Sequence, residues 1–158
     1  MKVMVGGTFD PLHDGHKKLL ERSFEIAGDA GLVTIGLSGD KFANRKTHPI
    51  RPFAKRKKDL TDYLKSKNYV TKWEVEELSD RFGSTLEKDF DAIVVSEETF
   101  PTAVEINKLR KEKNMKKVDI HQITCVLAAD GKWISSTRIW RGEIDTHGCL
   151  LNSENLNL

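Results

Sequence analysis

The chain has 158 residues, of which 32% are charged and 38% are hydrophobic, and its net charge is +2. This length suits one domain with a full core, and the charge lies too close to neutral to indicate nucleic-acid binding by itself. No apolar run approaches the roughly 20 residues that a membrane-spanning helix needs. The two cysteines, Cys125 and Cys149, lack C-x-x-C spacing, so we expect free thiols in a reducing cytoplasm.

The first part of the chain predicts a strand, a helix and a second strand. Residues 2–5 are short and apolar enough for a buried strand, so we expect no signal peptide before it, and two glycines then break the strand. From Gly15 to residue 27 the apolar residues follow helical spacing, with Asp14 as the expected N-cap. Residues 32–37 are again apolar, so the unit is βαβ and the two strands pair in parallel.

His13 and His16 stand three residues apart where this helix begins, so both can face one ligand. A helix N-terminus offers free N–H groups and the positive end of the helix dipole, which together attract anions. Two imidazoles beside these N–H groups suit the phosphates of a nucleotide. Two alternatives stay open: a purely structural strand–glycine–helix junction, and a zinc site, which would need a third and a fourth ligand.

The rest of the chain continues the alternation of strands and helices. Strands are expected at 70–78, 90–95 and 118–126, and helices at 53–67, 101–114 and shortly after residue 134. Together with the first unit, these elements predict an α/β fold. The expected architecture is a Rossmann-like, doubly wound parallel five-stranded sheet with helices on both faces.

Residues 41–58 hold eight Lys or Arg and no acid. Their first part, residues 41–52, leaves the carboxyl end of a strand, which is where open α/β sheets bind ligands. We therefore expect Lys41 or Lys46 to reach a phosphate, although a solvated lysine explains each residue equally well. Lys55 to Lys58 are expected to form the exposed face of the following helix.

Glu97 and Glu98 follow the buried strand at 90–95, again at a carboxyl end. The helix dipole favours acids near the start of the next helix in any case. We still expect one of the two to line a site, and we assign that role to Glu98. His121, by contrast, is expected to be an ordinary strand residue.

Two motifs resemble those of a known superfamily. G-G-T-F-D-P at 6–11, followed by H-D-G-H at 13–16, resembles the first signature of the H-x-G-H nucleotidyltransferases, and I-S-S-T-R-I at 134–139 resembles the second. V-S-E-E-T at 95–99 and N-K-L-R at 107–110 resemble the archaeal and eukaryotic form of phosphopantetheine adenylyltransferase. The Gly-Leu-Arg segment of the bacterial form is lacking.

This resemblance implies that the AMP group of ATP moves to 4′-phosphopantetheine, giving dephospho-coenzyme A and pyrophosphate. A phosphate monoester has a second pKa of about 6, so the acceptor is largely a dianion and needs no general base. A cytidylyltransferase of the glycerol-3-phosphate type, whose second motif is I-S-T-T, remains the nearest alternative. Adenylyl transfer to nicotinamide mononucleotide or to flavin, and a non-catalytic nucleotide sensor, also stay open.

The resemblance also implies the site residues. His16, Lys41 and Thr8 are the expected catalytic residues, with His16 acting on the α-phosphate as charge builds. The expected nucleotide-binding residues all belong to the motifs: Gly7, Thr8, Phe9, His13, His16, Glu98, Ser135, Ser136, Thr137 and Arg138. The expected substrate-binding residues lie near the acceptor phosphate: Thr8, Asp10, Lys41 and Lys46.

Mg²⁺ is expected on the ATP phosphates, held through water and substrate oxygens, so no protein metal ligand is predicted. Residues 1–144 are expected to form the nucleotidyltransferase domain, and residues 145–158, polar and rich in asparagine, a loosely ordered tail. The expected partners are ATP and 4′-phosphopantetheine, with neither nucleic acid nor membrane. We expect a cytoplasmic monomer rather than a higher oligomer.

Overall fold

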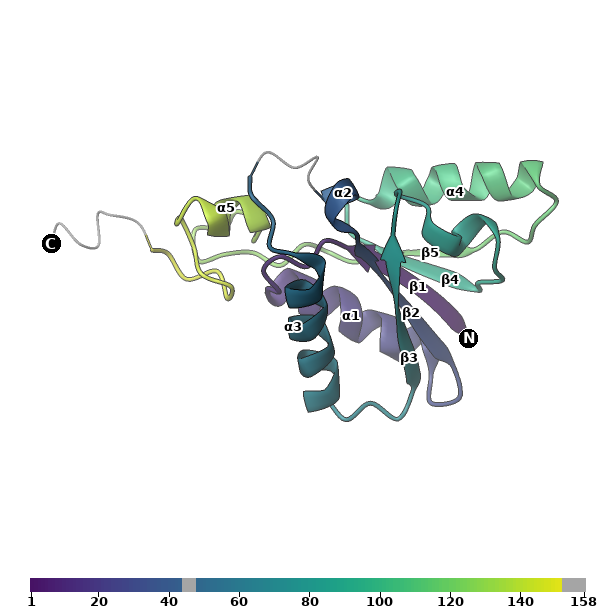
Figure 1. Cartoon of the computed structure of the whole chain (residues 1–158), viewed down its shortest axis with the longest axis horizontal. Coiled ribbons are helices and arrows are strands. Elements are labelled where there is room, and N and C mark those ends of the chain that lie inside the picture. Colours follow the sequence, from purple (N-terminus) through teal and green to yellow (C-terminus); the bar gives the residue numbers. More distant parts are fainter. Residues whose placement is uncertain (44–47, 152–158) are drawn as a thin grey trace, which may run out of the picture.

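Five parallel strands form one sheet in the order β3-β2-β1-β4-β5 in the computed structural model, which describes residues 1–43 and 48–151. The strands are β1 (Lys2–Gly7), β2 (Leu32–Ser38), β3 (Lys72–Leu78), β4 (Ala92–Val95) and β5 (Asp119–Gln122). From β1 the chain builds outward to β3, then returns to the other side of β1 to form β4 and β5 (Figure 1). The predicted α/β fold with a five-stranded parallel sheet is confirmed.

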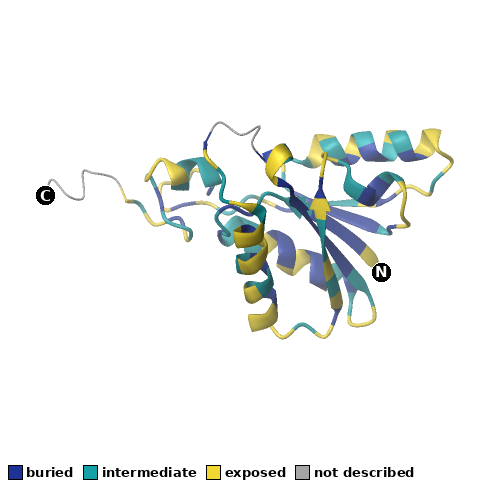
Figure 2. Cartoon of the chain, viewed as in Figure 1, coloured by how far each residue is buried: buried dark blue, intermediate teal, exposed yellow. Residues whose placement is uncertain are grey.

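Helices cover both faces of this sheet (Figure 1). On one face, α1 (Asp14–Ala27) and α3 (Phe53–Ser66) pack on alternate residues of β1 and β2 such as Val3, Val5 and Val33. On the other face, α4 (Phe100–Glu112) and the 3₁₀ helix η1 (Gly83–Leu86) pack against Met4 and Ile93. Both faces of the central strands are therefore buried, as expected for a parallel sheet (Figure 2).

The order of the strands places a ligand-binding position between β1 and β4. The two strands are neighbours, with Val3 beside Ala92. The two strands that come next after β1 in the chain, β2 and β3, lie on one side of it, whereas β4 and β5 lie on the other side, so the strand order reverses here. Open α/β sheets bind ligands outside the carboxyl ends of the strands at such a reversal point. The chain after β1 leads into α1, and the chain after β4 leads into α4, so both connections lie at this point.

Some element boundaries differ from the prediction. The strand expected at 118–126 ends at residue 122, because β4 has only four residues and offers β5 no longer partner. The connection after β2 contains a short helix, α2 (Asp40–Ala43). Asp14 is the first residue of α1 and not its N-cap; the N-cap is His13, whose backbone is extended.

The prediction that residues 55–58 form an exposed face is wrong for Arg56, which is fully buried. Its guanidinium donates hydrogen bonds to the carbonyl oxygens of Thr8 (3.1 Å), Ser38 (2.7 Å) and Arg51 (2.7 Å). A fourth bond, of 3.1 Å, reaches Asp40. Arg56 thus fastens α3 to the backbone that follows β1 and β2, where the strands end.

The chain after β5 forms a small unit of its own around α5 (Ser136–Trp140). Its core consists of Ala128, Ile134 and Ile144, and two isolated bridges, at 127–133 and 144–150, close its loops. Residues 145–151, part of the expected tail, make hydrogen bonds to this unit and to α1. Residues 152–158 lie outside the described part of the chain. Within that part, no helix combines the length and apolarity needed to cross a membrane.

Candidate active site

His13 and His16 cap the start of α1 reciprocally. His13 Nδ1 accepts from the backbone N–H of His16, and His16 Nδ1 accepts from that of His13, both at 3.3 Å. The rings stack with centroids 3.7 Å apart, and the Phe9 ring lies 4.8 Å from that of His16. Because each Nδ1 accepts a hydrogen bond, the proton of the neutral imidazole lies on Nε2, which makes Nε2–H a donor suited to an anion.

The glycine between the histidines is required by this geometry. A Cβ atom added at Gly15 would lie 2.8 Å from Cε1 of His13, closer than real Cβ contacts allow. The spacing H-x-G-H therefore has a local cause: the first imidazole folds back over the glycine to cap the helix.

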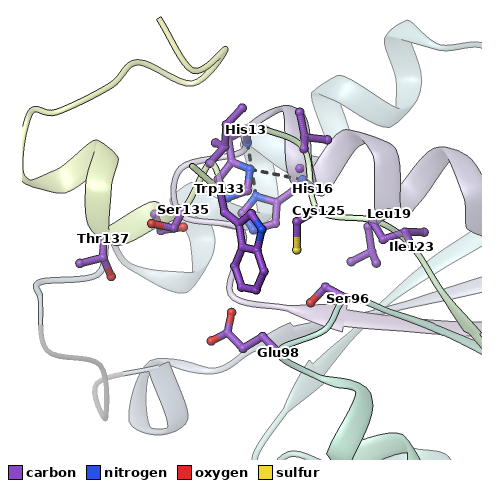
Figure 3. A pocket seen from close by; sticks show the side chains of 14 residues that line it. His13, His16, Leu19, Ser96, Glu98, Ile123, Cys125, Trp133, Ser135 and Thr137 are labelled. Atoms are coloured by element: carbon purple, nitrogen blue, oxygen red, sulfur yellow. Dashed lines mark hydrogen bonds between the residues drawn. The ribbon is translucent and has the colours of Figure 1, made fainter. Parts of the chain in front are cut away.

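Two cavities meet at His16. The first, of about 220 Å³, lies between the start of α1 and residues 133–137, and its lining includes both histidines, Cys125 and Trp133 (Figure 3). The second, of about 350 Å³, begins at Thr8 and extends over the face of the sheet that α4 covers. It is lined mainly by apolar side chains of β1, β3, β4, α4 and the segment before η1. His16, Leu19, Ser96 and Glu98 line both cavities.

The serine-rich motif lines the first cavity together with the two histidines. Ser135 is the N-cap of α5, and its hydroxyl accepts from the backbone N–H of Arg138 at 3.2 Å. Ser136 and Thr137 follow in the first turn, and all three residues line the cavity. Glu98 comes from the other side, directly after β4 (Figure 3).

Thr8 and Gly7 line the second cavity close to His16. The Thr8 hydroxyl lies 3.5 Å from that of Ser38, at the end of the neighbouring strand. Phe9 is buried, has a positive φ of 50°, and packs under His16 instead of lining either cavity.

Asp10 is buried and serves the loop before α3. Its carboxylate accepts hydrogen bonds from the backbone N–H of Arg51, at 2.9 Å, and from the Arg51 guanidinium, which also pairs with Asp59 at 2.7 Å. Burial lowers the pKa of Arg51, but the hydrogen bonds and charges of Asp10 and Asp59 outweigh it and raise that pKa. Asp10 thus holds Arg51, which directly precedes the N-cap of α3, close to the end of β1. Asp10 lines neither cavity.

Two further predicted residues, Lys41 and Arg138, line neither cavity. Lys41 is exposed on α2, next to residues that line the second cavity. Arg138 pairs with Asp130 and Glu143, and its hydrogen bond to Asp130 lowers the pKa of that carboxyl. Lys46 lies outside the described residues.

The structure therefore brings the larger part of the predicted site together around two cavities: Gly7, Thr8, His13, His16, Glu98, Ser135, Ser136 and Thr137. Sequence reasoning missed Trp133, Cys125 and Ser96 as lining residues. The signal for Trp133 was its place directly before the serine-rich motif. Among the described residues, no three side chains of His, Cys, Asp or Glu gather as a metal site.

Comparison with known proteins agrees with this arrangement. The sequence model of the "Cytidylyltransferase-like" family matches residues 4–142, a span that includes both motifs. A phosphopantetheine adenylyltransferase from Methanosarcina mazei is 48% identical over 150 residues, covering 94% of this chain and 96% of the relative. One from Archaeoglobus fulgidus is 41% identical over 151 residues, covering 96% of this chain and all of the relative.

The chain belongs to the archaeal phosphopantetheine adenylyltransferases of the cytidylyltransferase-like family. The family resemblance of the two motifs is thereby confirmed. Among solved structures, a protein of unknown function from Archaeoglobus fulgidus superposes with a TM-score of 0.71 at 36% identity, covering 78% of this chain and 89% of that one. The similarity to this family thus covers the sheet, the two histidines and the serine-rich motif.

Proposed function

We propose that the chain transfers the AMP group of ATP to 4′-phosphopantetheine, releasing pyrophosphate and dephospho-coenzyme A. The observation that carries this proposal is the junction of the two cavities at His16. A transferase that joins two substrates needs two binding places that meet at the reacting atom. One cavity here is lined by histidine, serine and threonine side chains suited to phosphates as well as by apolar ones, and the lining of the other is largely apolar.

The first cavity suits ATP. His13 and His16 offer Nε2–H donors beside the N-terminus of α1, and Ser136 and Thr137 line the same cavity. This arrangement favours a triphosphate held between the two motifs. The indole of Trp133, half exposed on the cavity wall, offers an apolar surface for the base (Figure 3).

The second cavity suits the pantetheine arm, which is long, mostly apolar and carries a few amide groups. Its wall includes Leu78, Phe82 and Ile106, and the polar residues Thr8, Ser96 and Thr102 interrupt it. An acceptor lying here would bring its phosphate to Thr8 and His16, where the cavities join. Lys41 or Lys46 would neutralise that phosphate from the basic segment.

The reaction follows from positioning and charge. An oxygen of the acceptor phosphate, already a dianion, attacks the α-phosphorus of ATP; the new P–O bond forms as the bond to the β-phosphate breaks, and pyrophosphate leaves. His16 stabilises the charge that builds on the α-phosphate, while Ser135 to Thr137 hold the leaving group. Mg²⁺ would arrive with ATP and neutralise part of the triphosphate charge.

The apolar wall of the second cavity also weighs against the main alternative. Glycerol 3-phosphate is short and polar throughout, so it would leave that wall of apolar side chains uncovered. Nicotinamide mononucleotide and flavin mononucleotide each end in a flat aromatic ring system, whereas the apolar side chains that line this cavity are mainly aliphatic. The pantetheine arm is the acceptor that the lining favours.

The test is pyrophosphate release with Mg²⁺, ATP and 4′-phosphopantetheine, measured beside CTP with glycerol 3-phosphate. We expect release with the first pair only, together with dephospho-coenzyme A identified by mass. Release with the second pair only would reject the proposal in favour of a cytidylyltransferase. A cytoplasmic location and a monomeric state remain predictions, the latter testable by light scattering.

A further inference from the structure

A tight turn at residues 145–149 is built around one carboxylate. Asp145 Oδ1 accepts from the backbone N–H groups of His147 and Cys149, both at 2.9 Å. The backbone of Asp145 also bonds to that of Gly148 and Cys149, and Gly148 has a positive φ of 82°. The backbone bond from Cys149, followed by that from His147, keeps the pKa of the Asp145 carboxyl below its usual value.

One side of this turn lies on the start of α1. The backbone N–H of Asp14 donates to the carbonyl oxygen of Thr146 at 3.0 Å. The Asp14 carboxylate meets Nδ1 of His147 at 2.9 Å. Asp14 stands directly after the N-cap His13, so the turn is attached to the residue between the cap and the glycine of the H-x-G-H motif.

The other side of the turn lies on the segment that carries the serine-rich motif. The backbone N–H of Ala129 donates to the carbonyl oxygen of Gly148 at 2.9 Å. A Cβ atom at Gly148 would lie 2.8 Å from Cα of Ala128 and 2.9 Å from Cδ1 of Ile134, so only glycine permits this approach. Ile134, which is buried with Ile144, directly precedes Ser135.

We propose that residues 145–149 act as a brace that sets the separation of the two phosphate-binding motifs, with Asp14 and His147 as its positioning residues. The inference rests on the proposed function in one respect, that ATP lies between the motifs. Neither side chain lines the first or the second cavity, so the pair acts on ATP through His13, His16 and Ser135.

The exposure of Asp14 and His147 distinguishes a role in positioning the two motifs from a role in folding stability. The His147 side chain is 61% exposed and that of Asp14 35%, and exposed ion pairs contribute little to folding stability. Yet the contact joins residues 133 positions apart in the chain, directly beside the N-cap of α1. Its loss should therefore leave the fold intact and loosen the geometry that holds the triphosphate.

The test compares three variants at one position. His147→Ala removes the contact, His147→Asn keeps a polar group near the position of Nδ1, and His147→Gln places one near Nε2 instead. Affinity for Mg²⁺–ATP is measured by calorimetry, with KM and kcat for both substrates and the melting temperature of each variant. His121→Ala, on β5 and outside both cavities, is the matched control.

We expect His147→Ala and His147→Gln to weaken ATP binding about fivefold, with the KM for 4′-phosphopantetheine and the melting temperature unchanged. His147→Asn should bind ATP like the unmodified chain. Asp14→Asn, which keeps the backbone bond to Thr146 but removes the carboxylate charge, should weaken ATP binding in the same way and guards against a folding defect in any one variant.

Unchanged ATP affinity in both His147→Ala and Asp14→Asn would overturn the brace, as would equal behaviour of His147→Asn and His147→Gln. Because the main measurement is ATP binding, it stays decisive if the acceptor proves to be a different phosphate. In that case the unmodified chain binds ATP without forming dephospho-coenzyme A, which rejects the proposed function alone.

Discussion

The two cavities that meet at His16 differ in where their lining residues stand in the sequence. Most of the polar lining of the first comes from two short motifs, H-x-G-H at 13–16 and I-S-S-T at 134–137. The second takes single apolar residues from several strands and helices, such as Met4, Leu78 and Ile106. Under the proposed function, the phosphate contacts are therefore local in the sequence, whereas recognition of the acceptor arm depends on the fold.

The largest expected effect lies where the cavities join. His16→Ala should lower kcat by about 10²–10³-fold, because a donor aimed at developing phosphate charge is lost. ATP should still bind, since the α1 N-terminus and the serine-rich motif remain. Pyrophosphate release and calorimetry with ATP check both parts. A variant with unchanged kcat would exclude His16 from the chemical step.

Gly15→Ala tests the histidine cap within the first cavity. We expect it to weaken ATP binding about tenfold, because the new methyl group displaces the imidazole of His13. Alanine is the better helix former by about 1 kcal/mol, so α1 itself should not suffer. Calorimetry with ATP and the melting temperature separate the two effects. Wild-type affinity would show that the reciprocal cap is not needed for the nucleotide.

The second cavity should respond separately. Thr102→Phe places a large ring in it from α4, and Val104→Phe places the same ring on an exposed part of the same helix. We expect the first change to raise the KM for 4′-phosphopantetheine about tenfold with ATP affinity unchanged, and the second to change neither. Initial rates at varied acceptor concentration measure the difference. A rise in both variants would indicate a general distortion of α4.

The sequence predicted the fold class and the phosphate motifs because both depend on local patterns. Five apolar runs alternate with helical spacing, and this gives a parallel sheet without knowledge of the contacts. The N-cap of α1 was wrongly predicted as Asp14, because aspartate is a common capping residue. The observed cap is His13, whose imidazole folds back over a glycine, and no residue pattern indicates that geometry.

The same limit applies to single charged residues. Arg56 stands in a run of basic residues and reads as exposed, yet it is fully buried, because four oxygen acceptors from distant segments surround its guanidinium. Arg138, expected near the nucleotide, pairs with Asp130 and Glu143, which stand eight residues before it and five after it. Three of the four acceptors of Arg56 belong to residues 16 to 48 positions earlier in the chain, so the spacing of neighbouring residues does not reveal them.

The smallest effect concerns Trp133, where the first cavity departs from its local motifs. Its indole is 49% exposed on the cavity wall, while that of Trp140 is 55% exposed and lies outside both cavities. Stacking of a base on an aromatic ring contributes about 1–3 kcal/mol, and a half-exposed ring favours the lower end, so Trp133→Ala should raise the KM for ATP about fivefold. Trp140→Ala is the control, and ATP should quench the fluorescence of Trp133 in a chain that keeps it while Trp73 and Trp140 are replaced by phenylalanine. Equal effects of the two replacements would mean that the base lies elsewhere, and that the first cavity recognises only the phosphates.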